Sequence, residues 1–181
     1  MALTTILNVE VTLSDVDRSV YETLELRLAQ HPSETTKYLL SRLFAYCLSY
    51  EEGIAFSRGG LSDTDEAPVS VRDPTGLLLA WIDVGLPSAE RLHKASKAAR
   101  RVSLFSTAER SQLMREALQR PIHKVEAIEV FLLEASFIAA LEAKLERRVA
   151  LEIVRNEGQL YVTIGGNTLE SALVRTSLVN S

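Results

Sequence analysis

One acidic residue and two lysines near the middle of the chain carry the side chains best suited to phosphate chemistry. Asp83 lies near the end of the apolar run 77–84 (LLLAWIDV), and Lys94 and Lys97 follow on the helix predicted over 89–101. A carboxylate can hold a divalent cation, and an ammonium group can contact a phosphate. The spacing therefore fits a phosphate-cleaving site. It fits a structural salt bridge equally well, and the residues alone leave both readings open.

The elements around Asp83 explain why this residue needs a partner. The run 77–84 is almost wholly apolar and is flanked by turn residues, which predicts a central strand buried on both faces. A buried carboxylate without a partner is costly, so Asp83 must be paired, protonated or bound to a metal. Ser88 is the expected N-cap of the following helix. That helix carries a basic stripe, which fits either a solvated face or a phosphate-binding one, at Lys94, Lys97 and Arg101.

A second candidate acid, Glu34, lies at the start of an earlier helix. Apolar residues at helical spacing predict this helix over 34–51, with Ser33 as its N-cap and Gly53 just past its end. An acid in the first turn complements the helix dipole, which is the simpler explanation of Glu34. A carboxylate that faces a metal is the alternative.

The remaining periodicities predict a mixed sheet with helices on its faces, an α/β or α+β fold. We expect a single domain over residues 1–181, because the chain has an ordinary length and no long linker. Ser106 and Glu109 form an expected capping box, and a hairpin turn is expected at 156–158. The predicted strands are 3–13, 20–30, 54–56, 69–72, 77–84, 102–105, 124–133, 148–154, 159–164 and 168–174, and the predicted helices are 34–51, 89–101, 107–119 and 135–146.

Composition excludes several classes of protein. A net charge of −4 argues against a chain coated with basic residues for nonspecific DNA binding, although it permits a local basic patch. The lone cysteine, Cys47, rules out an internal disulfide and is expected in the core. The first residues, MALTTILNVEV, lack the basic n-region that a signal peptide has, and no apolar run approaches the length of a membrane span, so we expect no membrane partner and a cytoplasmic location. Nucleotide-binding glycine loops and zinc-binding histidine motifs are absent from the sequence.

Several short stretches, in order along the chain, are similar to the YaeQ family of bacterial proteins. They are the segment 31–35 (HPSET), the Arg58-Gly59 turn, the segment 81–87 (WIDVGLP) and the pair Lys94-Ala95. The resemblance covers essentially the full length. It implies the fold of the PD-(D/E)XK nucleases, with a restriction-endonuclease-like αβββαβ core at about residues 33–105 and extra N- and C-terminal strands.

The resemblance also implies roles for particular residues. In active nucleases of that superfamily, acids on a helix and on two strands bind one or two Mg²⁺ ions, and a lysine completes the site. Carried over by position, the catalytic residues would be Glu34, Glu66, Asp83 and Lys94, with Glu66 and Asp83 binding Mg²⁺ or Mn²⁺. Arg58 and Lys97 would contact the phosphates of the substrate.

The chain departs from the superfamily pattern at two points. The lysine expected two residues after the third-strand acid is replaced by Gly85, so Lys94 or Lys97 must supply that charge. Pro68 is followed by Val69 instead of an acid, so Glu66, or Asp65, must stand in.

Two functions follow from this reading. The first is metal-dependent hydrolysis of phosphodiesters in nucleic acid. The alternative is a catalytically degenerate nuclease fold that binds nucleic acid or protein.

Overall fold

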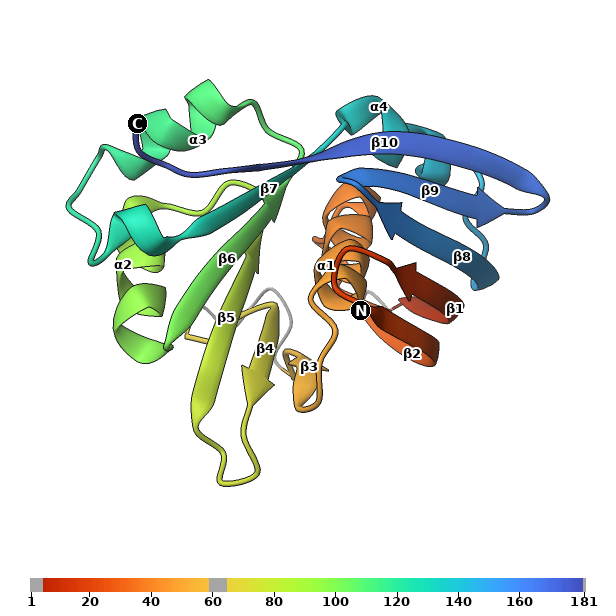
Figure 1. Ribbon diagram of the computed structural model, residues 1–181, viewed down its shortest axis with the longest axis horizontal. Helices are drawn as coiled ribbons and strands as arrows, with labels where there is room; N and C mark the ends of the chain where they lie inside the picture. The colour runs from red at the N-terminus through yellow and green to blue at the C-terminus, as the bar shows by residue number, and fades with distance from the viewer. Residues whose placement is uncertain (1–4, 59–64, 181) are drawn as a thin grey trace. The chain divides into compact units, whose positions relative to one another are not determined.

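The computed structural model describes residues 5–58 and 65–180 (Figure 1). Gly59, predicted in the glycine turn, lies outside the described residues. The chain divides into two compact units, residues 1–40 with 133–173 and residues 41–132 with 174–181, and each is described by itself. No described helix is long and apolar enough to cross a membrane. The fold is mixed α+β, with mixed sheets flanked by helices, and the prediction of a single domain stays a prediction.

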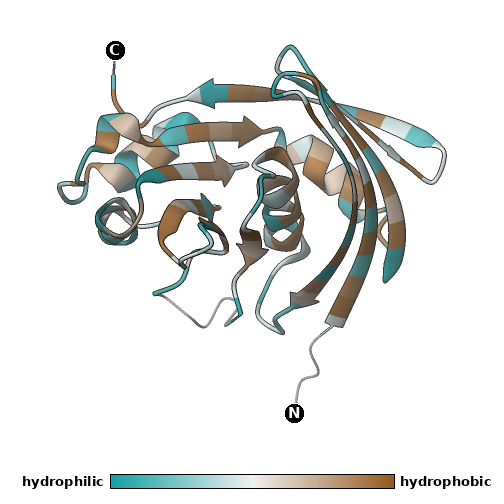
Figure 2. Cartoon of the chain, turned by 60° about the horizontal axis from the view of Figure 1, so that its bottom comes forward, coloured by the Kyte–Doolittle hydropathy of each residue, from teal (hydrophilic) through white to brown (hydrophobic). Residues whose placement is uncertain are grey.

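The first unit is built on a five-stranded mixed sheet in the order β2-β1-β8-β9-β10. β1 pairs antiparallel with β2 and parallel with β8. Alternation of apolar and polar residues along β1 places one face in the core, as predicted, and Figure 2 shows this alternation as bands along the strands. The strands are β1 (Thr5–Asp15), β2 (Val20–Gln30), β8 (Arg148–Asn156), β9 (Gln159–Ile164) and β10 (Asn167–Thr176). Helix α4 (Ala135–Glu142) buries its apolar residues, Phe137, Ile138 and Leu141.

The helix predicted over 34–51 is shorter, and its cap is a different residue. Helix α1 spans Thr36–Leu48, and the hydroxyl of Thr35, not Ser33, accepts the backbone N–H of Tyr38 at 3.1 Å. A turn precedes the helix because the Glu34 N–H donates to the His31 carbonyl at 2.8 Å. Glu34 therefore lies before the first turn and not within it. Cys47 is buried, as predicted, and burial raises the pKa of its thiol.

The second unit contains a five-stranded sheet in the order β3-β4-β5-β6-β7. β3, β4 and β5 are antiparallel neighbours, whereas β5, β6 and β7 are parallel. Helix α2 (Ala89–Ala98) joins β5 to β6 and packs on both strands (Figure 1). Along the chain, α1 is followed by β3, β4, β5, α2 and β6. The strands are β3 (Ile54–Phe56), β4 (Val69–Arg72), β5 (Leu78–Val84), β6 (Arg101–Ser106) and β7 (Glu129–Leu133).

Three predicted boundaries in this unit are wrong. Helix α2 ends at Ala98, so Arg101 opens strand β6 and is not part of the helical stripe. Helix α3 spans only Arg110–Ala117, because the Ser106 hydroxyl accepts the N–H of Ala108 in a tight turn and leaves no capping box. The start of the strand predicted over 124–133 forms a short 3₁₀ helix instead, Val125–Ala127.

The hairpin between β8 and β9 is held from outside by an aspartate. Glu157 and Gly158 both have positive φ, 51° and 72°, as a two-residue hairpin turn requires. Their N–H groups donate to the Asp17 carboxylate at 2.7 and 3.0 Å. The Gly158 N–H lowers the pKa of Asp17 most; burial opposes it, and the Glu157 N–H and the Arg155 guanidinium lower it further.

The lowered pKa of Asp17 predicts that part of the protein's stability is lost in acid. A lowered pKa in the folded state means that Asp17 stabilises the fold at pH values above its ordinary pKa of 3.8, and that this stabilisation is lost as the pH falls through the lowered value. We therefore expect Asp17→Asn to have a lower melting temperature than wild type at neutral pH. The difference between the two melting temperatures should become smaller as the pH falls below 3.8. Thermal unfolding followed by circular dichroism across this range measures both. An unchanged difference at low pH would contradict the assignment.

Gly53 was predicted to lie just past a helix end, but it lies five residues after the last residue of α1, in the approach to β3. Its φ is +91°, and a Cβ built there would lie 2.1 Å from the Arg72 carbonyl oxygen. The backbone N–H of Arg72 donates to the Gly53 carbonyl at 3.1 Å. Glycine is required at this position because the two backbone segments approach too closely for any side chain.

We expect Gly53→Ala to destabilise the protein more than Gly76→Ala. Gly76 has nearly the same φ, +90°, but nothing lies within 4 Å of its Cβ position, so this control carries the backbone strain alone. That strain costs about 1–3 kcal/mol, and Gly53→Ala adds the clash with Arg72. Urea unfolding of both variants gives the two values, and equal losses would show that the close approach relaxes at no cost.

Candidate functional site

The carboxylate of Asp83 is buried near the end of β5, where three donors hold it. The side chain exposes 2% of its surface. Its Oδ2 accepts the Trp81 indole N–H at 3.1 Å, and its Oδ1 accepts the Val84 backbone N–H at 3.0 Å. The third donor is Arg91, whose Nε lies 2.8 Å from Oδ2. The partner that the buried Asp83 carboxylate requires is therefore the Arg91 guanidinium, a cation of the protein itself.

Arg91 reaches this carboxylate because helix α2 starts immediately after β5. The Ser88 hydroxyl caps the helix, as predicted, by accepting the Arg91 backbone N–H at 3.1 Å. The guanidinium lies over the Trp81 ring, 5.3 Å from its centroid, and also donates to the Glu66 carbonyl at 3.2 Å. A cation in the first helical turn opposes the helix dipole, and the adjacent carboxylate offsets that cost. Arg91 thus joins strand β5 to the segment that precedes β4.

Two other residues predicted for the site, Glu66 and Lys94, contact neighbours other than Asp83. Glu66 is half-buried, and its carboxylate accepts the backbone N–H of Arg58 at 3.3 Å. Lys94 pairs with Asp65, and both side chains expose more than half of their surface, 51% and 73%. An exposed pair of this kind contributes little stability. Lys94 is therefore committed to a loop acid and not to Asp83.

Glu34 belongs to the first unit. It is buried, and its Oε1 accepts the backbone N–H of His31 at 3.2 Å. Its carboxylate thus helps to hold the turn that precedes α1.

The donors around Asp83 do not fit the divalent-cation site expected there. Mg²⁺ and Mn²⁺ require several carboxylate or other oxygen ligands around one point. Among residues 5–58 and 65–180, no three His, Cys, Asp or Glu side chains are arranged to hold a metal ion. The Arg91 guanidinium already binds the Asp83 carboxylate, to which a metal ion would have to bind. The Glu66 carboxylate accepts the backbone N–H of Arg58.

A cluster of basic side chains that sequence reasoning did not assemble lies on α2 and the segment before β7. The His123 backbone N–H donates to Nδ1 of His93 at 3.0 Å, which fixes this segment against the helix. Burial lowers the pKa of His123, and Lys97, Lys124 and His93 lower it further by charge repulsion, while Glu126 opposes them. We call these four residues the basic cluster: His93, Lys97, His123 and Lys124.

Of the basic cluster only Lys97 was predicted as a site residue. Lys124 follows His123 directly and has a left-handed backbone, with φ of 49°, in the turn that leads to the 3₁₀ helix. Lys124 was predicted to begin a strand, and a strand there gave no reason to expect that this segment contacts α2. The sequence separation of 30 residues between His93 and His123 gives no local signal.

The comparisons with known proteins agree with one another. The family model described as "YaeQ protein" matches residues 1–173. Proteins named "Uncharacterized protein YaeQ" from Escherichia coli (strain K12) and Salmonella typhi are 31% and 33% identical, over 92% and 93% of each chain. The chain belongs to the YaeQ family. The crystal structure of YaeQ protein from Pseudomonas syringae matches at a TM-score of 0.85 with 29% identity, over 96% of each chain. The structure of YaeQ protein from Xanthomonas axonopodis pv. citri matches at 0.85 with 28% identity, over 97% of this chain and 99% of that one.

In this member of the YaeQ family, we expect Arg91 to contribute far more than Lys94 to the free energy of unfolding. Arg91→Met leaves the buried Asp83 carboxylate without its cation, a loss that costs about 3 kcal/mol. Lys94→Gln removes an exposed ion pair and costs less than about 1 kcal/mol, so it is the matched control. Urea unfolding of the two variants measures both losses, and similar small losses would mean that Asp83 does not depend on Arg91.

Proposed function

We propose that this chain is a nuclease-like fold that binds the phosphate backbone of nucleic acid without cleaving it. The order α1-β3-β4-β5-α2-β6 resembles the αβββαβ core of the PD-(D/E)XK nucleases, with Asp83 on the third of the three strands. The observation that supports the proposal is the contact of Arg91 with Asp83, at 2.8 Å, because Asp83 is the acid that the resemblance to these nucleases would assign to metal binding. A protein cation here leaves the fold able to bind phosphates but removes the means of cleavage.

The basic cluster is the part of this unit best suited to phosphates. Lys97 and Lys124 are exposed, and neither forms an ion pair with another described residue. Together the two lysines create a local excess of positive charge in a chain whose net charge is −4. Clustered cations that release counterions from a phosphate backbone provide affinity that does not depend on sequence. The exposed Arg58, also predicted to contact phosphates, remains a candidate for a further contact.

Binding is tested with fluorescein-labelled single-stranded DNA, RNA and duplex DNA by fluorescence anisotropy, in EDTA. We expect saturable binding at low salt, and a fall of the logarithm of the affinity with the logarithm of salt concentration. Each phosphate contact contributes a slope of about 0.7 to 0.9. The variant Lys97→Gln/Lys124→Gln should weaken binding and reduce this slope by about 1.4 to 1.8.

The matched control for this variant is Lys144→Gln, which removes an exposed lysine of the first unit. It should leave the affinity and the slope unchanged. Absence of binding at low salt, or equal losses in the control and in the cluster variant, would overturn the proposal.

Metal-dependent phosphodiester hydrolysis is the second candidate. One observation favours it: Arg91 contacts both the Asp83 carboxylate and the Glu66 backbone, so the two residues expected to bind Mg²⁺ or Mn²⁺ lie around a single guanidinium. Cleavage would require Asp83 to exchange Arg91 for the metal. The test is to incubate the labelled oligonucleotides with the protein and Mn²⁺. Under the first proposal the oligonucleotides stay intact. Hydrolysis would be favoured if the wild-type protein gives shortened products and the Asp83→Asn variant gives none.

A further inference from the structure

Strand β2 is the outermost strand of the first unit's sheet, and it carries exposed charged side chains. It is 11 residues long and pairs with β1 along its whole length. Glu25 and Arg27 point from it to the exposed face. Neither side chain forms an ion pair with another described residue. A long edge strand normally needs protection, because its outer backbone groups can pair with another strand.

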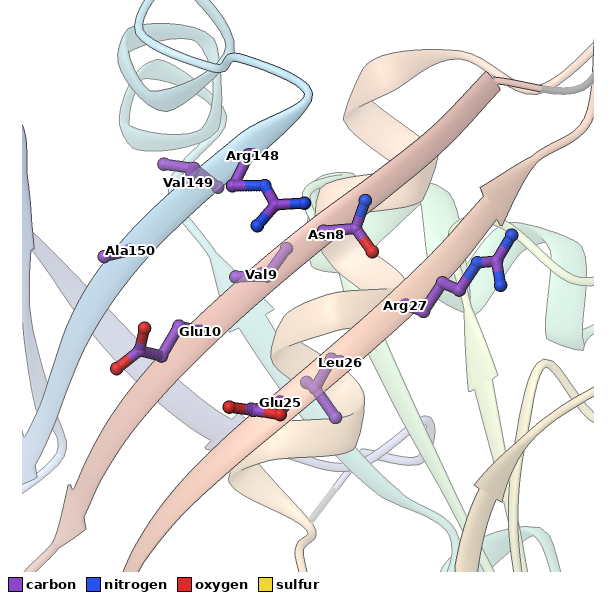
Figure 3. Close-up of a pocket in the computed structure, with 9 residues that line it drawn as sticks. All are labelled: Asn8, Val9, Glu10, Glu25, Leu26, Arg27, Arg148, Val149 and Ala150. Carbon is purple, nitrogen blue, oxygen red and sulfur yellow. The ribbon is translucent and has the colours of Figure 1, made fainter.

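The charges on this face are ordered in two rows, one that crosses three strands and one with charges on two of them (Figure 3). In the first row, Asn8 on β1 lies between Arg27 on β2 and Arg148 on β8. In the second row, Glu10 lies opposite Glu25. The two rows line a shallow groove of about 580 Å³. Residues two apart on a strand lie about 6.6–6.8 Å apart, so a cationic row runs beside an acidic row and both stop at the open edge of β2.

The central part of the opposite face of β2 is apolar. Leu24 and Leu28 are buried, and Leu26 between them is half-buried. A strand added beside β2 must therefore present leucine-like side chains on the core face. On the exposed face it must place a cation beside Glu25 and an acid beside Arg27.

We propose that a second copy of this chain supplies that strand, by antiparallel pairing of the two β2 strands about a twofold axis at Leu26. In this register Glu25 lies opposite the partner's Arg27, and Arg27 lies opposite the partner's Glu25. Leu24 meets the partner's Leu28 on the core face. The acidic row of each copy continues into the cationic row of the other, so the surface complements itself as a twofold interface requires.

The charges select this register over its neighbours. A shift of the pairing by two residues in one direction places Glu25 opposite the partner's Glu25. A shift in the other direction places Arg27 opposite the partner's Arg27. Like charges directly opposite each other are destabilising, whereas opposite charges stabilise an antiparallel pair. A shift by one residue would place the leucines of one copy opposite the charges of the other.

Sedimentation velocity of the full chain across a range of concentrations tests the pairing through charge reversal. Wild type should dimerise. Arg27→Glu and Glu25→Arg each put like charges opposite each other at two places, and each should weaken the dimer by about tenfold or more. Arg148→Glu, a reversal in the same row but two strands from the edge, should leave the dimer intact and is the matched control.

Two rescue experiments decide whether the pairing is the one described. An equimolar mixture of Arg27→Glu and Glu25→Arg restores both opposite-charge pairs between unlike copies, so it should dimerise although each variant alone does not. The double variant Glu25→Arg/Arg27→Glu restores them between like copies. Circular dichroism shows that the variants are folded. A monomeric wild type, dimers unaffected by either single reversal, or a mixture that fails to dimerise would each overturn the proposal.

Discussion

The contact between Arg91 and Asp83 is the constraint on which the second unit depends. A carboxylate buried in a parallel-paired strand has to find compensation, and Asp83 finds it in an arginine eight residues later, at the first turn of α2. The same guanidinium covers the Trp81 ring and donates to the Glu66 carbonyl. It therefore fixes the start of α2, the end of β5 and the approach to β4 together. The charge that would otherwise be available for chemistry is used to hold these three segments.

Much of the fold was predictable because alternation and turn chemistry are local. The eleven residues of β2, the hairpin turn at Glu157-Gly158 and the cap at Ser88 all follow from neighbours in sequence. The errors lie at helix ends, where several residues compete to cap. Ser33 and Thr35 are both good caps, and the turn between His31 and Glu34 gives the position to Thr35. Gly53 looked like a helix end because its role, passing close to the Arg72 carbonyl, depends on a distant strand.

The candidate site was predictable only in part. The sequence required a partner for Asp83 but could not choose among the cations of α2, since that choice depends on how the helix is rotated against β5. Lysines were expected there, yet the arginine in the first turn reaches Asp83 and Lys94 pairs with Asp65. The basic cluster was missed for a different reason. His93 and His123 are held together by a hydrogen bond from the His123 backbone N–H to Nδ1 of the His93 ring, which no sequence periodicity records.

We propose that the Arg91 guanidinium stands at Asp83 in place of a metal ion, so that the unit binds phosphates and does not cleave them. Calorimetric titration of the wild-type protein with Mn²⁺ tests this most directly, because it needs no assumption about the substrate. We predict no saturable binding, since Arg91 already neutralises the carboxylate. Saturable binding that disappears in a folded Asp83→Asn variant would contradict the claim and return the site to metal-dependent chemistry.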